Sequence, residues 1–147
     1  MVKFKILLLL LISSAAMANY MHPGINRLIQ ANDNPTGVVF ELIESDKSTW
    51  VWAAPMIKDL KDQLKAKYPD IEIAVVSHGR EQFQLTKKRA KHQELAISIL
   101  GDLVRKEGVD LHVCGTHSSW YDIPASSYID IVDVAVSGPA KINDYIN

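Results

Sequence analysis

Cysteine is nearly absent from this chain of 147 residues, since Cys114 is the only one. A single cysteine excludes a disulfide bond within the chain, whichever compartment the protein occupies. Four roles remain open for Cys114: a small buried apolar side chain, a bridge to another molecule, a metal ligand or a reactive thiol.

An excess of positive charge is also lacking. The chain has 16 Lys and Arg against 17 Asp and Glu, which gives a formal net charge of −1. A nucleic-acid-binding protein would show a strongly basic balance, so we predict no nucleic-acid partner. The long apolar run at residues 7–12 is too short for a comfortable membrane span, and we predict no stable membrane anchor.

The first residues have the features of a secretory signal. Lys3 and Lys5 precede the apolar run at 7–12, and the Ala-Met-Ala sequence at 16–18 has the small residues that signal peptidase requires. We predict that residues 1–18 are a cleaved signal peptide and that the mature protein is periplasmic or secreted. A retained N-terminal anchor is the rival interpretation.

The rest of the chain is predicted to be a lead-in at residues 19–36 and one domain at 37–147. The lead-in is predicted to contain a turn of helix at 25–30. Apolar runs with β-branched residues predict four strands, at 37–43, 71–77, 109–114 and 131–136. Amphipathic segments predict helices between them: one capped by Asp46 or Ser48 and ended by Tyr68, one at 93–106 stopped by Gly108, a short one near 124–128, and a terminal one opened by Ser137.

This alternation of strands and helices indicates an α/β fold. Strands joined through helices pair in parallel by right-handed crossovers, with helices covering the sheet. We predict a three-layer α/β/α domain with a mainly parallel sheet of four to five strands. The apolar runs in the sequence identify four of these strands.

Residues with chemical potential gather where the predicted strands end. In an open parallel sheet, ligands bind beyond the carboxyl ends of the strands. The candidates that follow the four strands are Glu44, Ser45 and Asp46; His78 and Gly79; Cys114, Gly115, Thr116 and His117; and Ser137 and Gly138. Among them we predict a catalytic role for Cys114 and His117, and a binding role for His78, Gly79, Gly115, Thr116, Ser137 and Gly138.

Cys114 is the predicted centre of this site. A helix or turn that begins near Thr116 would aim N–H groups at the sulfur, and such groups stabilise a thiolate. His117 could add positive charge or accept the thiol proton. A buried, inert thiol stays an equal alternative. His112, which shares a sheet face with Cys114, is interpreted as a core histidine.

Other interpretations of these side chains remain open. Cys114, His117 and His78 could together hold zinc or copper, although only one Cys-x-x-His pair exists and we predict no metal and no other cofactor. The basic run at 87–91 is interpreted as an exposed helix entry. Trp120 is a candidate for the wall of a pocket or of an interface.

Four segments of the chain resemble the DsrE/DsrF-like proteins, which include sulfur-relay subunits and small YchN-type proteins. The matching segments are a strand ending in His78-Gly79, a helix ending at residues 106–109, the strand with Cys114-Gly115-Thr116, and Ser137-Gly138-Pro139 before the terminal helix. The resemblance covers the chain from residue 38 to its end.

This resemblance implies a five-stranded sheet, homo-oligomers such as trimers or hexamers, and a cysteine that carries sulfur as a persulfide. Cys114 is similar to that cysteine. Some members have a second cysteine where this chain has His117, so only a one-thiol carrier is possible here. We therefore predict an exported carrier of sulfane sulfur, a possible sulfurtransferase, that exchanges sulfur with a partner protein or a small reduced-sulfur compound. The alternatives are an oligomeric binding module with a structural Cys114 and a Cys/His metal-binding protein.

Overall fold

The computed structural model describes residues 22–31 and 34–147 of the chain. The predicted signal peptide at 1–18 lies outside the described residues. The strands are β1 (Gly37–Leu42), β2 (Glu72–Ser77), β3 (Asp110–Cys114) and β4 (Asp133–Ala135). The helices and 3-10 turns are α1 (Pro23–Gln30), α2 (Thr49–Lys67), η1 (Arg80–Leu85), α3 (Lys87–Ala90), α4 (Glu94–Glu107), α5 (Gly115–Ser119), η2 (Ala125–Ser127) and α6 (Gly138–Ile146).

The four strands form one parallel sheet in the order β1-β2-β3-β4. This confirms the predicted three-layer α/β/α class with a four-stranded sheet. The described residues contain no fifth strand, which the resemblance alone had implied. The strand predicted at 131–136 is shorter than expected, because a turn in which Val132 donates to the carbonyl of Ile129 occupies its start.

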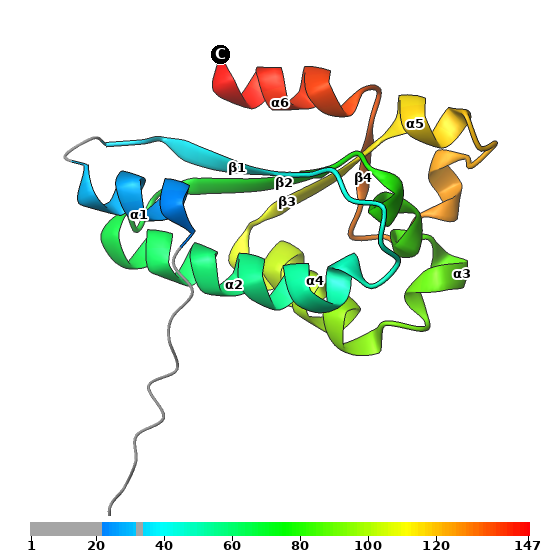
Figure 1. Ribbon diagram of the computed structural model, residues 1–147, viewed down its shortest axis with the longest axis horizontal. Helices are drawn as coiled ribbons and strands as arrows, with labels where there is room; N and C mark the ends of the chain where they lie inside the picture. Colours follow the sequence, from blue (N-terminus) through cyan, green and yellow to red (C-terminus); the bar gives the residue numbers. More distant parts are fainter. Residues whose placement is uncertain (1–21, 32–33) are drawn as a thin grey trace, which may run out of the picture.

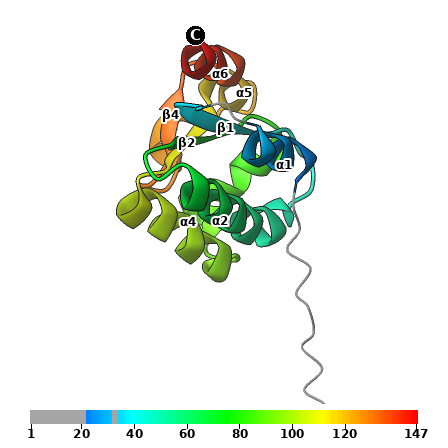
Figure 2. The same cartoon turned by 90° about the vertical axis from the view of Figure 1, so that its left-hand side faces the viewer.

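The strand order explains why the helices are unevenly divided between the two faces. Successive right-handed crossovers in one direction place their helices on the same side of a sheet. Accordingly α2 and α4 lie side by side beneath the sheet, while α6 lies across the other face (Figure 1). Figure 2 shows the three layers end-on, with α1 beside α2 near the β1 edge.

The α2–α4 face carries the main hydrophobic core. Its strand residues alternate with those of the other face, as the period of a strand requires. The fully or almost fully buried aliphatic residues of this core include Ile57, Leu60, Leu64, Ile73, Val75, Leu100, Leu103, Leu111 and Val113. No helix within residues 22–31 and 34–147 is long and apolar enough to cross a bilayer.

A polar network joins α6 to the face of the sheet opposite α2 and α4. His112 on β3 is 5% exposed, and its Nε2 lies 2.7 Å from the hydroxyl of Tyr145 on α6. That hydroxyl donates to Asp110 at 2.8 Å, and Nδ1 of His112 lies 2.8 Å from the carboxylate of Asp133. The interpretation of His112 as a hydrogen-bonded core histidine is therefore confirmed. Burial, followed by the hydrogen bond to Asp110, raises the pKa of Tyr145 well above its usual value.

Two local predictions need correction. Ser48 is the N-cap residue of α2, but its side chain does not cap the helix. The carboxylate of Asp46 instead accepts hydrogen bonds from the backbone and hydroxyl of Ser48, which lower the pKa of Asp46. The segment after Gly79, for which no element was predicted before the basic run at 87–91, begins with the buried turn η1, whose hydrogen bonds organise the site.

Candidate functional site

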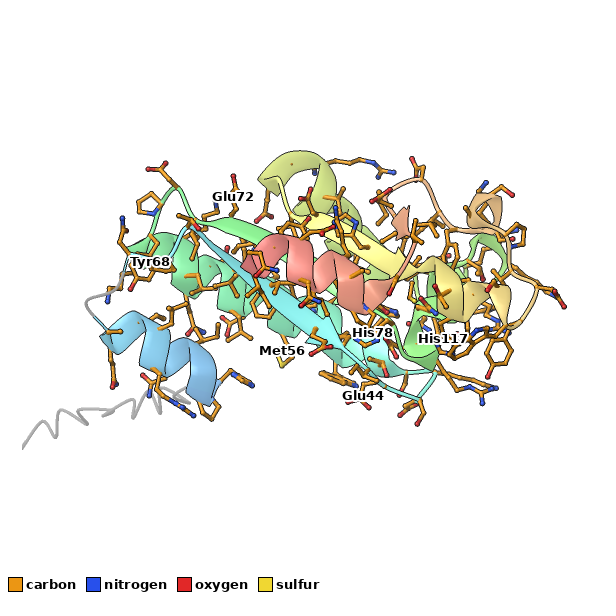
Figure 3. All side chains as sticks on the ribbon, turned by 90° about the horizontal axis from the view of Figure 1, so that it is seen from above. Glu44, Met56, Tyr68, Glu72, His78 and His117 are labelled. Atoms are coloured by element: carbon orange, nitrogen blue, oxygen red, sulfur yellow. The ribbon has the colours of Figure 1, made fainter. Side chains whose placement is uncertain are left out.

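The carboxyl ends of β1, β2 and β3 and the start of α6 enclose a recess of about 520 Å³, here called the thiol recess. Figure 3 shows Glu44, His78 and His117 at this end of the sheet, and Tyr68 and Glu72 at the opposite end. The residues that line the thiol recess are Ile43, Glu44, Ser45, His78, Gly79, Arg80, Cys114, Thr116, His117, Trp120, Ser137 and Pro139.

The structure brings the predicted site residues together. Six of the eight with a predicted role line the thiol recess directly. The other two lie just behind it, because Gly115 is the first residue of α5 and Gly138 packs against Cys114 and His78. Of the three candidates after β1, Glu44 and Ser45 line the recess and Asp46 does not.

The basic run at 87–91 takes no part in the thiol recess. None of its residues is among those that line the recess. Lys87, Lys88 and Arg89 are exposed on α3, as their interpretation as a helix entry predicts.

Cys114 is held at the floor of the recess by both of its neighbouring elements. It is the last residue of β3 and the N-cap of α5, and it is 5% exposed. The backbone N–H of His117 donates to Sγ at 3.4 Å. On the other side, the backbone N–H of Cys114 donates to Oε1 of Gln82 at 2.7 Å. The predicted turn after the cysteine therefore exists and directs an N–H group at the sulfur.

The imidazole of His117 is fixed by a carbonyl and by aromatic rings. Its Nδ1 lies 2.9 Å from the backbone carbonyl of His78. A carbonyl only accepts, so Nδ1 carries the hydrogen and Nε2 is the free acceptor of the neutral ring. The rings of Phe83, Trp120 and Tyr121 meet the imidazole edge-on, with centroid distances of 5.1, 5.3 and 5.6 Å. The hydrogen bond from His117 to the sulfur thus comes from its backbone and not from its ring.

His78 occupies the side of the recess under α6. Its Nε2 lies 2.8 Å from the carboxylate of Glu41 on β1. A Cβ atom added at Gly138 would lie 2.6 Å from Cβ of His78 and 3.4 Å from Cβ of Cys114. Only a glycine at the start of α6 allows the helix to approach these two side chains so closely. The predicted Ser137-Gly138 element therefore seats α6 against the thiol.

Glu81 and Gln82, which the sequence patterns did not identify, connect the ends of three strands. Both are fully buried on η1. The carboxylate of Glu81 accepts hydrogen bonds from the backbone of Glu44 at 2.7 Å, the hydroxyl of Ser77 at 2.7 Å and the backbone of Gly79 at 3.0 Å. Since Gln82 accepts from the backbone N–H of Cys114, the two neighbours hold β1, β2 and β3 in fixed relation around the recess.

Gly79 makes this connection possible. A Cβ atom there would lie 2.5 Å from the backbone nitrogen of Glu44 and would also collide with the carboxylate of Glu81. The signal that could have identified Glu81 is its place two residues after a glycine that ends a buried strand. Such a position is where a side chain can turn back toward free backbone N–H groups.

A second layer of hydrogen bonds supports α5 from behind. The hydroxyl of Ser118 donates to the carbonyl of Cys114 at 2.9 Å and lies 2.7 Å from the hydroxyl of Tyr128. Burial raises the pKa of the Tyr128 phenol above its usual value. The peptide group of Cys114 is therefore bound through its N–H by Gln82 and through its carbonyl by Ser118.

The thiol recess has one exposed cation and one exposed carboxylate at its mouth. Arg80 and Glu44 both line it, and within the described residues neither forms an ion pair. The guanidinium of Arg80 lies 5.7 Å from the ring centroid of Tyr121. The apolar side chains of Ile43 and Trp120, 61% and 71% exposed, form the remaining rim.

The side chains present do not favour a metal centre. Among the described residues, no group of three His, Cys, Asp or Glu side chains has an arrangement that could hold a metal ion. His117 uses Nδ1 on a carbonyl, and His78 uses Nε2 on Glu41. What the arrangement can do is present one sulfur, with an N–H donor beside it, to a small molecule in the recess.

Comparison with known proteins supports the fold and identifies no activity. No protein-family model matches the chain, and no curated protein matches it. Among solved structures, a protein of unknown function from Methanobacterium thermoautotrophicum is similar, with a TM-score of 0.55 and 20% sequence identity. The alignment covers 74% of this chain and 88% of that one. At this identity the likeness supports the α/β/α fold alone.

Proposed function

We propose that this protein is an exported sulfur carrier of the DsrE/DsrF-like type, in which Cys114 holds sulfane sulfur as a persulfide. The observation that supports the proposal most directly is the position of the only thiol. Cys114 lines an open recess at the carboxyl edge of the sheet and is not a member of the main hydrophobic core cluster, and 5% of its surface is exposed. A thiol must reach solvent in order to exchange sulfur.

The surroundings of the sulfur suit an anion. The backbone N–H of His117 points at Sγ, and such a donor stabilises a thiolate or the terminal sulfur of a persulfide. His117 also lines the recess, and its Nε2 forms no hydrogen bond within the described residues. The chain has no second cysteine to resolve the persulfide internally, so sulfur received at Cys114 must leave to another molecule.

The N-terminal residues and the exposed apolar rim support the remaining parts of the proposal. A signal sequence at 1–18 would direct the protein to the periplasm or the medium. Apolar side chains beside the recess, among them Trp120 at 71% exposure and Val136 at 88%, suit contact with a sulfur-donor or sulfur-acceptor protein or with further copies of the chain. The family resemblance supports a homo-oligomer, a trimer or a hexamer.

A mass measurement tests the proposal. The mature protein is incubated with inorganic polysulfide or thiosulfate, and its intact mass and tryptic peptides are measured. We expect Cys114 to gain about 32 daltons, one sulfur atom, and to lose it again on treatment with dithiothreitol. Cys114→Ser, which has no thiol, is the control and should gain nothing. A native chain that iodoacetamide alkylates but that takes up no sulfur contradicts the proposal.

The binding-module alternative rests on one specific observation, the 5% exposure of Cys114. A free cysteine this buried is commonly an inert packing residue. The same experiment separates the two functions, because an inert thiol would resist both alkylation and sulfur uptake in the folded protein while reacting in urea.

A further inference from the structure

The thiol recess has a charge pattern that the proposed sulfur chemistry alone does not require. Sulfur transfer needs only a thiolate and access. The lining of the recess adds two exposed residues of opposite charge, Arg80 and Glu44, and within the described part of the chain neither forms an ion pair. They are also not paired with each other, so both are available to a ligand.

Both charged residues are held in place by their backbones. The backbone N–H of Arg80 donates to the carbonyl of Glu44 at 2.7 Å, and the N–H of Glu44 donates to the buried carboxylate of Glu81. The guanidinium of Arg80 is further placed by the ring of Tyr121. Arg80 and Glu44 therefore belong to one hydrogen-bonded piece of backbone that lines the same recess as Cys114.

The shape of the recess limits the size of its ligand. A volume of about 520 Å³ suits a small organic molecule. Cys114 is 5% exposed at the floor, so a sulfur atom on the flat surface of a folded protein would not reach Sγ without a protruding segment. The apolar rim of Ile43 and Trp120 offers contact to a short hydrocarbon chain.

We propose that the thiol recess takes the persulfide of a small amino-acid thiol, of which cysteine persulfide is the simplest, with its α-carboxylate on Arg80 and its α-ammonium on Glu44. This inference rests on the proposed function, because it names the donor for the same site. A guanidinium recognises a carboxylate, and a carboxylate recognises an ammonium group, by charge-assisted hydrogen bonds. A ligand that carries both groups satisfies both side chains at once.

The transfer step balances without a further oxidant or reductant. The thiolate of Cys114 attacks the terminal sulfur of the donor R–S–SH. The donor S–S bond breaks, the amino-acid thiolate R–S⁻ leaves, and a new S–S bond forms on Cys114. The terminal sulfur keeps its proton and its sulfane oxidation level, so Cys114 becomes the persulfide Cys–S–SH.

Three donors that differ only in charge test the inference. The rate of persulfide formation on Cys114 is measured by quenched mass spectrometry with the persulfides of cysteine, of cysteamine, which lacks the carboxylate, and of 3-mercaptopropionate, which lacks the ammonium group. We expect cysteine persulfide to react about fivefold faster than either at equal concentration, as one exposed ion pair allows. Each rate is divided by the rate at which the same donor modifies a free thiol peptide.

Charge-neutral variants assign the preference to side chains. In Arg80→Gln, cysteine persulfide should no longer react faster than cysteamine persulfide. In Glu44→Gln, it should no longer react faster than 3-mercaptopropionate persulfide. Arg105→Gln and Glu94→Gln on α4, outside the recess, are matched controls that should keep both advantages. Equal corrected rates for the three donors, or the same loss in the control variants, would overturn the inference.

The failure of this inference is distinguishable from the failure of the proposed function. If inorganic polysulfide modifies Cys114 but the three organic donors react alike, the sulfur carrier stands and its amino-acid donor does not. If a persulfidated protein transfers sulfur faster than cysteine persulfide at equal concentration, the amino-acid donor is again wrong and the carrier stands. If no donor modifies an alkylatable Cys114, the sulfur carrier itself is wrong.

Discussion

The two faces of the sheet are built from alternate residues of the same strands, yet they differ in chemistry. The face under α2 and α4 is aliphatic and almost completely buried, as Val75 and Val113 illustrate at 1% and 0% exposure. The face under α6 combines His112 and Cys114 with buried apolar residues such as Val76, and Tyr145 of α6 is hydrogen-bonded to His112. The candidate reactive side chains therefore lie on the face opposite the main hydrophobic core.

The strand order explains this division. Because the strands follow one another in sequence, right-handed crossovers place both long helices on one side. The other side is covered by the terminal helix α6, which has nine residues. Space for a ligand therefore remains beside α6 at the carboxyl edge, where strand ends also provide free backbone groups.

The largest expected effect comes from breaking the α2–α4 face. Leu100→Ala on α4 removes a side chain that is 1% exposed and should lower the free energy of unfolding by about 3 kcal/mol, from lost apolar burial and the cavity left behind. Leu95→Ala on the same helix is the matched control, since Leu95 is 76% exposed, and should change it by less than about 0.5 kcal/mol. Urea denaturation measures both, and similar losses would show that the core lies elsewhere.

The connection between the strand ends should be the next most sensitive feature. Glu81→Gln keeps the shape of the side chain but replaces one acceptor oxygen by an NH₂ group. In the native chain both oxygens accept hydrogen bonds from N–H or hydroxyl donors, so the NH₂ group must face one of these donors. Leaving a buried donor unpaired should cost about 2 kcal/mol. Urea denaturation and amide exchange at Glu44 and Gly79 measure the loss, with the exposed Glu94→Gln as control. Unchanged protection of both amides would contradict this role.

The helices, the strands and the edge that holds the site follow from local patterns in the sequence. Apolar runs with β-branched residues correspond to β1, β2 and β3 within a residue or two. Parallel strands bring their carboxyl ends together, so His78, Cys114 and Ser137 could be grouped without knowledge of their distances. The prediction for the lead-in helix at 25–30 is likewise confirmed by α1.

Features that depend on long-range pairing could not be predicted in this way. Glu81 and Gln82 belong to residue types that are usually exposed, and their burial follows from backbone donors 37 and 32 positions away in the chain. Tyr145 is linked to His112 across 33 positions. Arg80 could have been included among the candidate site residues, because it directly follows Gly79 at a strand end.

The smallest expected effect on stability comes from removing the hydrogen bonds by which Tyr145 of α6 binds the sheet. Tyr145→Phe keeps the ring on α6 but removes the hydroxyl that bridges His112 and Asp110, and it should lower the free energy of unfolding at pH 7 by about 1 kcal/mol. That loss should be smaller than the loss from Leu100→Ala, if the α6 face contributes less to stability than the α2–α4 face. A larger loss would reverse the comparison of the two faces.

The same variant should also change the response to alkaline pH. Burial raises the pKa of Tyr145 in the folded protein, so the fold favours the protonated phenol. Its contribution is fully present below the unfolded pKa of about 10 and is lost as the pH rises through the higher folded value. The native chain should therefore lose stability above about pH 10, and Tyr145→Phe should lose less. Tyr121→Phe, at an exposed ring far along the chain from Tyr145, is the control. Stability is measured by urea denaturation from pH 8 to about 11, and a parallel decline of all three chains would contradict the assignment.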